Sequence, residues 1–429
     1  MSQVLTDAAA TDDVQVIGLI GLAHGTSHFF HLLLPPLFPF LMRDFALSFT
    51  QVGFLMTIFF LVSGIGQALA GFVVDRHGGR PVLFFGIATL SLSAVVLSLA
   101  GGYDVLLASA ALAGLGNSVF HPADFTLLNR RVSPKRLGHA FSMHSLSGNL
   151  GWAAAPLFMA AISGASNWHV AAACAAAVGA LVLAILFVRR RVLDDASLET
   201  VVVARLDNSV ARPATAARAG AEKNTGIGDA LAFLRSDAVW LCFIFFFFAT
   251  AAFSILQNFA PAVFGTIYGM SVDAAAAALS SYLLASAAGI VVGGFIASRR
   301  ESAETTVAVA LGAAALTALL LASQIVPSWS VAVLLAIMGF GVGVSNPSRD
   351  LLVRRAATTR FGKASYGRVY GFVYSGLDAG FAVSPLVFGP LLDSGHFVSP
   401  LIGVAALQAG ALLSAFMVAR RSAHNVASA

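Results

Sequence analysis

Long apolar runs alternate with short polar segments along nearly the whole chain. Each run is close to the roughly 20 residues that a helix needs to cross a bilayer. The runs are continuous and do not alternate every second residue, which excludes a membrane barrel built of strands. We predict twelve membrane-spanning helices, at 16–42, 50–74, 82–101, 104–129, 138–163, 168–188, 238–267, 272–298, 304–324, 329–353, 367–392 and 398–419.

The twelve runs fall into two groups of six. Residues 189–237 separate the groups and contain a stretch nearly free of large hydrophobic residues, which predicts a disordered cytoplasmic linker. The expected organisation is therefore an N-terminal tail at 1–15, a six-helix bundle at 16–188, the linker, a second six-helix bundle at 238–419 and a C-terminal tail at 420–429.

Composition and charge narrow the class further. The chain is 58% hydrophobic and only 10% charged, which excludes a soluble domain. Of its 25 Lys and Arg residues, all but Arg43 and Arg349 lie on the segments that share one side of the membrane with the N-terminus. The positive-inside rule then predicts that both termini lie in the cytoplasm. We expect a multi-pass protein of the cell's inner membrane. Because the basic clusters are short and lie between the spans, they do not indicate nucleic-acid binding.

Two stretches of the first half recur in the second half. Residues 114–131, with His121 and Pro122, match residues 339–355, with Asn346 and Pro347 in the same places. Residues 138–156 likewise match 367–385, and there Asn149 aligns with Asp378. Parallel halves related by an axis along the membrane normal are typical of transporters that bind substrate near the bilayer midplane.

Short motifs add a family resemblance. The run SVFHP at 118–122 and the run GNLG at 148–151 resemble the fosmidomycin-resistance branch of drug exporters within the major facilitator superfamily. The superfamily's inner-loop motif is matched between spans two and three by Gly71, Asp75, Arg76, Gly79 and Arg80. The resemblance implies an all-α membrane protein of twelve transmembrane helices in two pseudo-symmetric six-helix bundles. It also implies a secondary transporter that works as a monomer, without enzymatic activity or a cofactor.

Polar residues inside the spans indicate which helices line the path. Ionisable groups are costly in hydrocarbon, so they are expected to face a cavity or each other. Spans three, six, nine and twelve lack such groups and are expected to face lipid, which leaves spans one, four, five, seven, ten and eleven around the path. The candidate substrate-binding residues are His24, His28, His31, Asn149, Gln257, Asn258 and Asn346.

The helical rise places the remaining polar residues at two depths. His28, His121, Asn149 and Asp378 are expected near the midplane, and a gate of Asp124, His144, Arg349 and Asp350 is expected nearer the inner surface. The repeat sets Asp124 opposite Arg349, and we expect the two to pair when the inner side is closed.

Histidine changes charge near neutral pH, with an unperturbed pKa of about 6.5. The branch that the chain resembles has an acid in span one where this chain has His28. We therefore predict that His121 and Asp378 carry the coupling proton and that His28 contacts substrate.

These observations favour proton-coupled export of a small organic solute or drug by alternating access, in a lipid bilayer and without nucleic-acid partners. Three alternatives stay open. His24, His28 and His31 lie at i, i+4 and i+7 on one helix face, which also suits an imidazole metal site. A transporter of divalent metal ions or metal chelates would use His24, His28, His121 and Asp378, although we assign no metal ligands. The second alternative is an uptake symporter for organic acids, and the third is a membrane receptor of the same fold that transports nothing.

Overall fold

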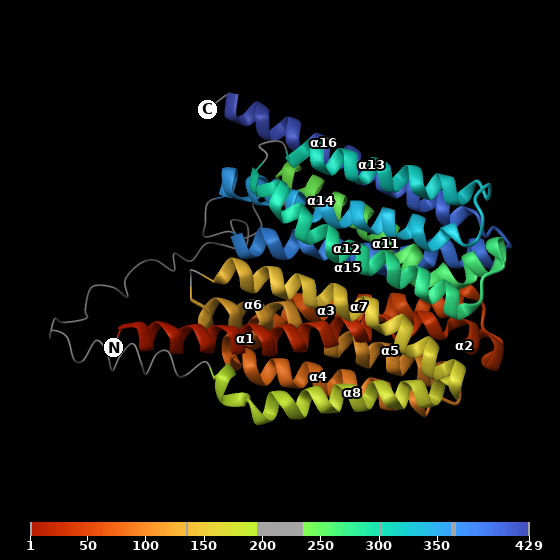
Figure 1. Ribbon diagram of the computed structural model, residues 1–429, viewed down its shortest axis with the longest axis horizontal. Helices are drawn as coiled ribbons and strands as arrows, with labels where there is room; N and C mark the ends of the chain where they lie inside the picture. The colour runs from red at the N-terminus through yellow and green to blue at the C-terminus, as the bar shows by residue number, and fades with distance from the viewer. Residues whose placement is uncertain (1, 134–135, 195–234, 300–302, 362–365, 428–429) are drawn as a thin grey trace.

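The computed structural model describes residues 2–133, 136–194, 235–299, 303–361 and 366–427, and these residues form helices joined by short connections, with no strand among them. The helices of the first half lie together on one side of the molecule and those of the second half on the other (Figure 1). Most of the predicted linker, residues 195–234, lies outside the described residues.

The first half contains eight α-helices: α1 (Ser2–His31), α2 (Phe38–Phe45), α3 (Phe49–His77), α4 (Gly79–Ser98), α5 (Tyr103–Asn117), α6 (Phe120–Arg131), α7 (Leu137–Ala165) and α8 (Trp168–Val188). Two 3₁₀ turns accompany them, η1 (Pro35–Leu37) and η2 (Arg190–Leu193). The second half contains α11 (Asp237–Tyr268), α12 (Val272–Arg299), α13 (Ala303–Ala322), α14 (Ser330–Phe361), α15 (Tyr366–Asp393) and α16 (Ser399–Ala427).

The expected membrane-spanning class is confirmed. Within the described residues, 11 segments are long and apolar enough to cross a membrane, and two of these segments join α1 to α2 and α5 to α6. The remaining predicted span, at 138–163, lies within α7, a helix of 29 residues that contains His144 and Asn149 and is not among these 11 segments. The expected tail at 1–15 is largely helical, since α1 begins at Ser2.

Two spans that were predicted as continuous helices are broken at prolines. The first, at 16–42, stops at His31 and resumes as α2 after the turn Pro35–Leu37, because Pro35 and Pro36 lack N–H groups and restrict the residue before them. The fourth, at 104–129, is interrupted between Asn117 and Phe120, one turn before Pro122. A proline ring clashes with the carbonyl group four residues earlier, which explains the position of this break.

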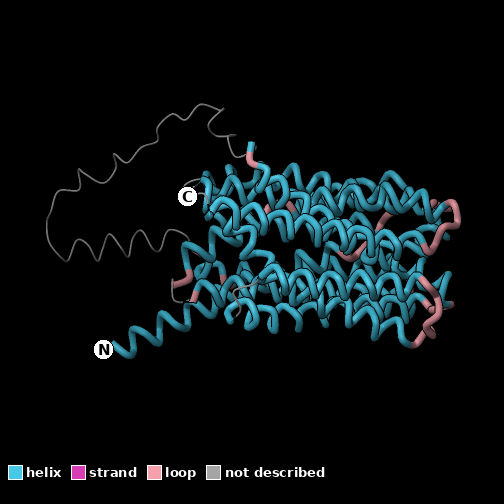
Figure 2. The backbone as a smooth tube through the Cα atoms, turned by 90° about the horizontal axis from the view of Figure 1, so that it is seen from above, coloured by secondary structure: helices cyan, strands magenta, loops and turns pink. Residues whose placement is uncertain are grey.

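The two halves meet along two pairs of helices, α3 against α15 and α7 against α12. The start of α1 and the end of α16 lie at one end of the molecule, which we call the terminal end (Figures 1 and 2). Helix α2 lies at the opposite, distal end (Figure 1). Large apolar side chains are exposed on α4, α8, α13 and α16, as expected for spans three, six, nine and twelve facing lipid. The expected set of lining spans was incomplete, because α3 and α12 also lie between the halves.

At the distal end a carboxylate joins the halves. Asp393, the last residue of α15, accepts hydrogen bonds from the backbone N–H groups of Phe49 (2.6 Å) and Thr50 (3.0 Å) and from the Thr50 hydroxyl (2.5 Å). These donors are at the N-terminus of α3, where unpaired N–H groups and the helix dipole favour a negative charge. Asp393 therefore holds the distal ends of the halves together.

We expect Asp393→Ala to make the distal end open more often, because the start of α3 loses its partner in the other half. The reporter is Ala262 on α11, which lines a cavity between the halves at the distal end. The readout is the rate at which a membrane-impermeant maleimide labels Ala262→Cys in a protein with Cys174→Ser and Cys242→Ser. Labelling should become several-fold faster with Asp393→Ala and stay unchanged with Asp104→Ala, an exposed acid at the same end. Equal labelling rates in the parent protein and in the Asp393→Ala and Asp104→Ala variants would contradict the role of Asp393 in holding the distal ends of the halves together.

Candidate functional site

The three histidines of α1 form a row of buried imidazoles. His24, His28 and His31 are only 2%, 8% and 6% exposed, although they belong to a membrane helix. The rings of His24 and His28 have centroids 4.4 Å apart, and those of His28 and His31 stack at 4.8 Å. The expected shared helix face is confirmed, and it points into the first half.

Asp124 is fully buried beside this row. Its Oδ2 accepts a hydrogen bond from His144 Nε2 at 3.0 Å. His24 Nδ1 lies 3.1 Å from the same oxygen, but in an orientation that makes no hydrogen bond. The rings of His24 and His144 stack with centroids 3.4 Å apart. The expected gate residues Asp124 and His144 are thus brought together, and His24 connects them to the histidines assigned to the midplane.

His31 has a different environment, centred on Asn117. Asn117 Oδ1 accepts hydrogen bonds from the Ser27 hydroxyl (2.8 Å) and from His31 Nε2 (2.6 Å), while Asn117 Nδ2 donates to Ser63 Oγ (2.8 Å). Trp152 Nε1 donates to the other ring nitrogen of His31 at 3.2 Å. Both nitrogens of His31 are therefore used, and this histidine ties α1 to α5 and α7.

A chain of three side chains crosses from the first half to the second. Gln67 on α3 accepts from His121 Nδ1 at 3.0 Å and donates its amide Nε2 to Asp378 Oδ2 on α15 at 3.3 Å. His121 and Asp378, expected to act as a pair, are thus linked through Gln67. Among the described residues, no Lys, Arg or His side chain forms an ion pair with Asp378.

In the described structure none of the other candidate substrate-binding residues forms a hydrogen bond with the histidines. Asn149 donates to the Ser145 carbonyl group of its own helix, and Asn346 is half-buried in α14. Gln257 and Asn258 are buried in α11, and both amide atoms of Gln257 and Oδ1 of Asn258 have no hydrogen-bond partner. Asn258 also lines a cavity of about 330 Å³ at the distal end. The cavity lies between the first-half turn at Pro35 and the second-half helix α11.

Some expected contacts fall outside what the structure describes. The backbones of Arg349 and Asp350 belong to α14, but their side chains lie outside the described residues, so the Asp124–Arg349 gate stays a prediction. The side chain of Asp75 is outside them as well.

The rest of the inner-loop motif forms the turn between α3 and α4. Gly71 is near the end of α3, the exposed Arg76 follows in its last turn, and Gly79 begins α4. Arg80 forms an ion pair with Asp194, with Nη1 3.1 Å from Oδ2. The motif thus connects α4 to the chain that follows α8.

Sequence reasoning missed four participants, Gln67, Ser63, Asn117 and Trp152. Gln67 and Ser63 lie in span two, which was not assigned to the path because it has no ionisable residue before its terminal-end turn. Asn117 is part of the recurring stretch 114–131 but was not among the predicted site residues. A polar amide within an apolar run was the available signal for both Gln67 and Asn117.

Two related halves of membrane-spanning helices, with a buried polar network in the first and hydrogen bonds across their interface, define a membrane transporter of small solutes. Known proteins agree with this class. The sequence profile of the Major Facilitator Superfamily matches residues 20–385. The chain belongs to the Major Facilitator Superfamily.

Curated relatives are similar over part of their length. The fosmidomycin resistance protein of Escherichia coli K12 is 33% identical over 168 residues, which are 38% of this chain and 41% of that protein. A probable 4-methylmuconolactone transporter of Cupriavidus pinatubonensis is 30% identical over 167 residues, 38% of each chain. The alignments thus cover less than half of these proteins.

Solved structures extend the likeness to nearly the whole chain. An inward-facing, unoccupied bacterial homologue of the human lysosomal transporter Spinster superimposes with a TM-score of 0.71 at 16% identity, over 95% of this chain and 98% of that one. The same homologue in an occupied state gives a TM-score of 0.69 at 15% identity, over 95% and 97%. At these identities the likeness establishes the fold.

Proposed function

We propose that the protein is a proton-coupled exporter of a small organic solute, with Asp378 as the proton-carrying group. The observation that carries the proposal is the hydrogen bond from Gln67 to Asp378 across the interface of the halves. A carboxylate at a moving interface, without a cation among its described partners, changes its surroundings whenever the halves rock. Protonation of Asp378 and the conformation of the transporter are thereby linked.

Export is favoured by the similarity to the fosmidomycin resistance protein. The similarity to the probable 4-methylmuconolactone transporter supports the second candidate, an uptake symporter for an organic acid or lactone. Both candidates use the same carboxylate, and they differ in the direction in which solute moves relative to the proton.

Flux in proteoliposomes distinguishes the candidates whichever way the protein inserts. In vesicles with an acidic lumen, an antiporter moves external solute inward as protons leave. In vesicles with an alkaline lumen, a symporter moves solute inward together with protons. We expect radiolabelled fosmidomycin or 4-methylmuconolactone to accumulate in acid-loaded vesicles only. Accumulation in alkaline-loaded vesicles only would favour the symporter, and accumulation independent of the pH difference would contradict proton coupling.

A further inference from the structure

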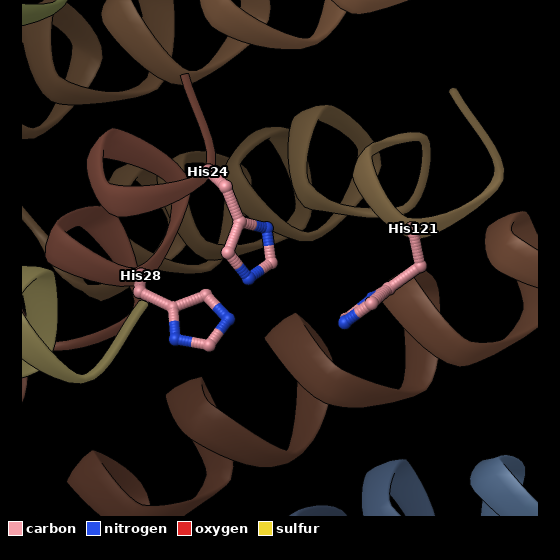
Figure 3. Close-up of side chains that lie close together, drawn as sticks. All are labelled: His24, His28 and His121. Carbon is pink, nitrogen blue, oxygen red and sulfur yellow. The ribbon is translucent and has the colours of Figure 1, made fainter. Parts of the chain in front are cut away.

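Three imidazoles from two helices converge inside the first half. His24 and His28 are one turn apart on α1, and His121 is on α6 just after the break in the fourth span. Their rings point toward one another (Figure 3). Each can offer a ring nitrogen such that the three nitrogens all lie within 4.8 Å of one another.

Two of these histidines carry a buried ring nitrogen that makes no hydrogen bond in the described structure. Nδ1 of His24 and Nδ1 of His28 are buried without a hydrogen-bond partner. Buried polar atoms are rarely left unpaired in folded proteins, so each such atom calls for a partner. Nδ1 of His24 lies 3.1 Å from the Asp124 carboxylate oxygen, which leaves Nε2 of His24 for a ligand, and the unpaired Nδ1 of His28 still calls for a partner.

Hydrogen bonding fixes which nitrogen His121 offers. The Gln67 carbonyl oxygen can only accept, so Nδ1 of a neutral His121 carries the proton that it donates to Gln67. Nε2 of His121 then has a free lone pair. An outer partner that holds an imidazole in one tautomer is the usual arrangement around metal-binding histidines.

Gly148 lets α7 pack directly against the imidazoles. A Cβ atom at Gly148 on α7 would lie 2.6 Å from His28 Nδ1 and 3.1 Å from His24 Nε2. Any residue larger than glycine would therefore press on both rings. Gly148 belongs to the GNLG run, and its missing side chain allows the two rings to keep their positions.

The charge near the cluster also suits a cation. The Asp124 carboxylate lies 3.1 Å from His24 Nδ1 in fully buried surroundings, where it would offset part of the positive charge of a metal ion. A second group, His24 with Asp124 and His144, has ligand atoms equally close. Asp124 there already accepts a hydrogen bond from His144, so the first group has the freer ligand atoms.

We propose that His24, His28 and His121 bind one divalent transition-metal ion, with a further coordination position open to water or to a donor atom of the transported solute. Unprotonated imidazole suits zinc, copper and nickel ions, and three histidines with one open position are a known coordination set. Metal–nitrogen bonds near 2.0–2.1 Å require nitrogens roughly 3.3 Å apart, so nitrogens within 4.8 Å of one another must close in by at most about 1.5 Å. The site goes beyond the proposed function and does not depend on the role of Asp378.

Equilibrium dialysis of untagged, full-length protein against Co²⁺ alone tests the site. We expect one Co²⁺ per chain, with the intense visible absorption of four-coordinate Co²⁺, and displacement by Zn²⁺. His28→Gln and His121→Gln should each weaken Co²⁺ binding by about tenfold or more. Loss of a residue that only hydrogen-bonds to a metal ligand already costs about tenfold or more in metal affinity. His169→Gln, which changes an exposed histidine stacked on Trp168 outside the cluster, should leave binding unchanged.

Gly148→Ala provides an independent variant that keeps every histidine, and it should also weaken Co²⁺ binding. Gel filtration identifies any variant that fails to fold, and the stoichiometry of the unmodified protein tests the proposal without variants. Substoichiometric binding by the unmodified protein, or equal binding by folded His28→Gln and His121→Gln proteins, would overturn the proposal. These binding measurements involve no transport, so their failure is distinct from failure of proton-coupled export.

A second arm asks in what form the metal arrives. Proteoliposomes are given radiolabelled Zn²⁺ alone or Zn²⁺ with citrate as a chelating acid. Accumulation of Zn²⁺ alone assigns the free ion as cargo, and accumulation only with citrate assigns a chelate. Stoichiometric binding without accumulation in either arm assigns a resident ion, and all three results support the site.

Discussion

Asp378→Asn is expected to abolish solute accumulation driven by a pH difference while leaving the exchange of labelled for unlabelled solute within a few-fold of normal. Asparagine has nearly the shape of a protonated aspartic acid and can still bond to Gln67, but it cannot release a proton. The variant should therefore pass through the transport cycle without coupling it to proton movement. Both activities are measured in the same proteoliposome preparation.

Two further variants make this test specific. Asp378→Glu retains a titratable carboxyl group and should retain part of the driven accumulation, whereas Asp104→Asn removes an exposed acid at the distal end and should have no effect. Gln67→Ala should shift the pH profile of driven transport without eliminating it, because Gln67 positions the carboxylate and carries no proton. Full driven accumulation by Asp378→Asn would show that the proton is carried elsewhere.

Gly293→Ala is expected to destabilise the second half markedly, whereas Gly294→Ala, one residue along the same helix, is expected to be neutral or slightly stabilising. A Cβ atom at Gly293 would clash with the carbonyl oxygen of Val344 on α14, while one at Gly294 would meet nothing. Overpacking of a tight contact costs about 1–3 kcal/mol. Alanine in place of glycine in an unobstructed helix gains up to about 1 kcal/mol.

The measurement is the thermal midpoint of each purified variant, followed by the loss of the monodisperse gel-filtration peak on heating. The two variants have the same composition and differ only in the position of one methyl group. Equal midpoints for the two would contradict the close approach of α12 and α14 as the feature that stabilises this half.

Much of the fold follows from local patterns. Run length and hydropathy predicted the all-α membrane class and the position of each span, because the cost of burying polar backbone in lipid acts on every residue of a span. The recurrence of 114–131 at 339–355 predicted two related halves. The periodicity of α1 predicted that His24, His28 and His31 share a face, since helical spacing depends only on positions along one chain segment.

The exact ends of the helices were less predictable. The sequence contains Pro35, Pro36 and Pro122, but a proline in a membrane span can either break the helix or lie within a continuous one. Pro122 follows a break in the fourth span, whereas Pro347 lies within the continuous α14. Neighbouring helices decide between these outcomes because they can satisfy the freed carbonyl groups.

The sequence by itself determined that this is a two-fold bundle of membrane helices with ionisable residues inside spans of both halves. Only the tertiary structure decided which side chains they contact. Asn117 accepts a hydrogen bond from His31, and Asp124 lies beside His24 and His144. Gln67 bridges His121 and Asp378 by hydrogen bonds. The physical reason is that helix periodicity acts within one segment, whereas a hydrogen bond requires two atoms about 3 Å apart. Distances between helices are set by the packing of residues far apart in the chain.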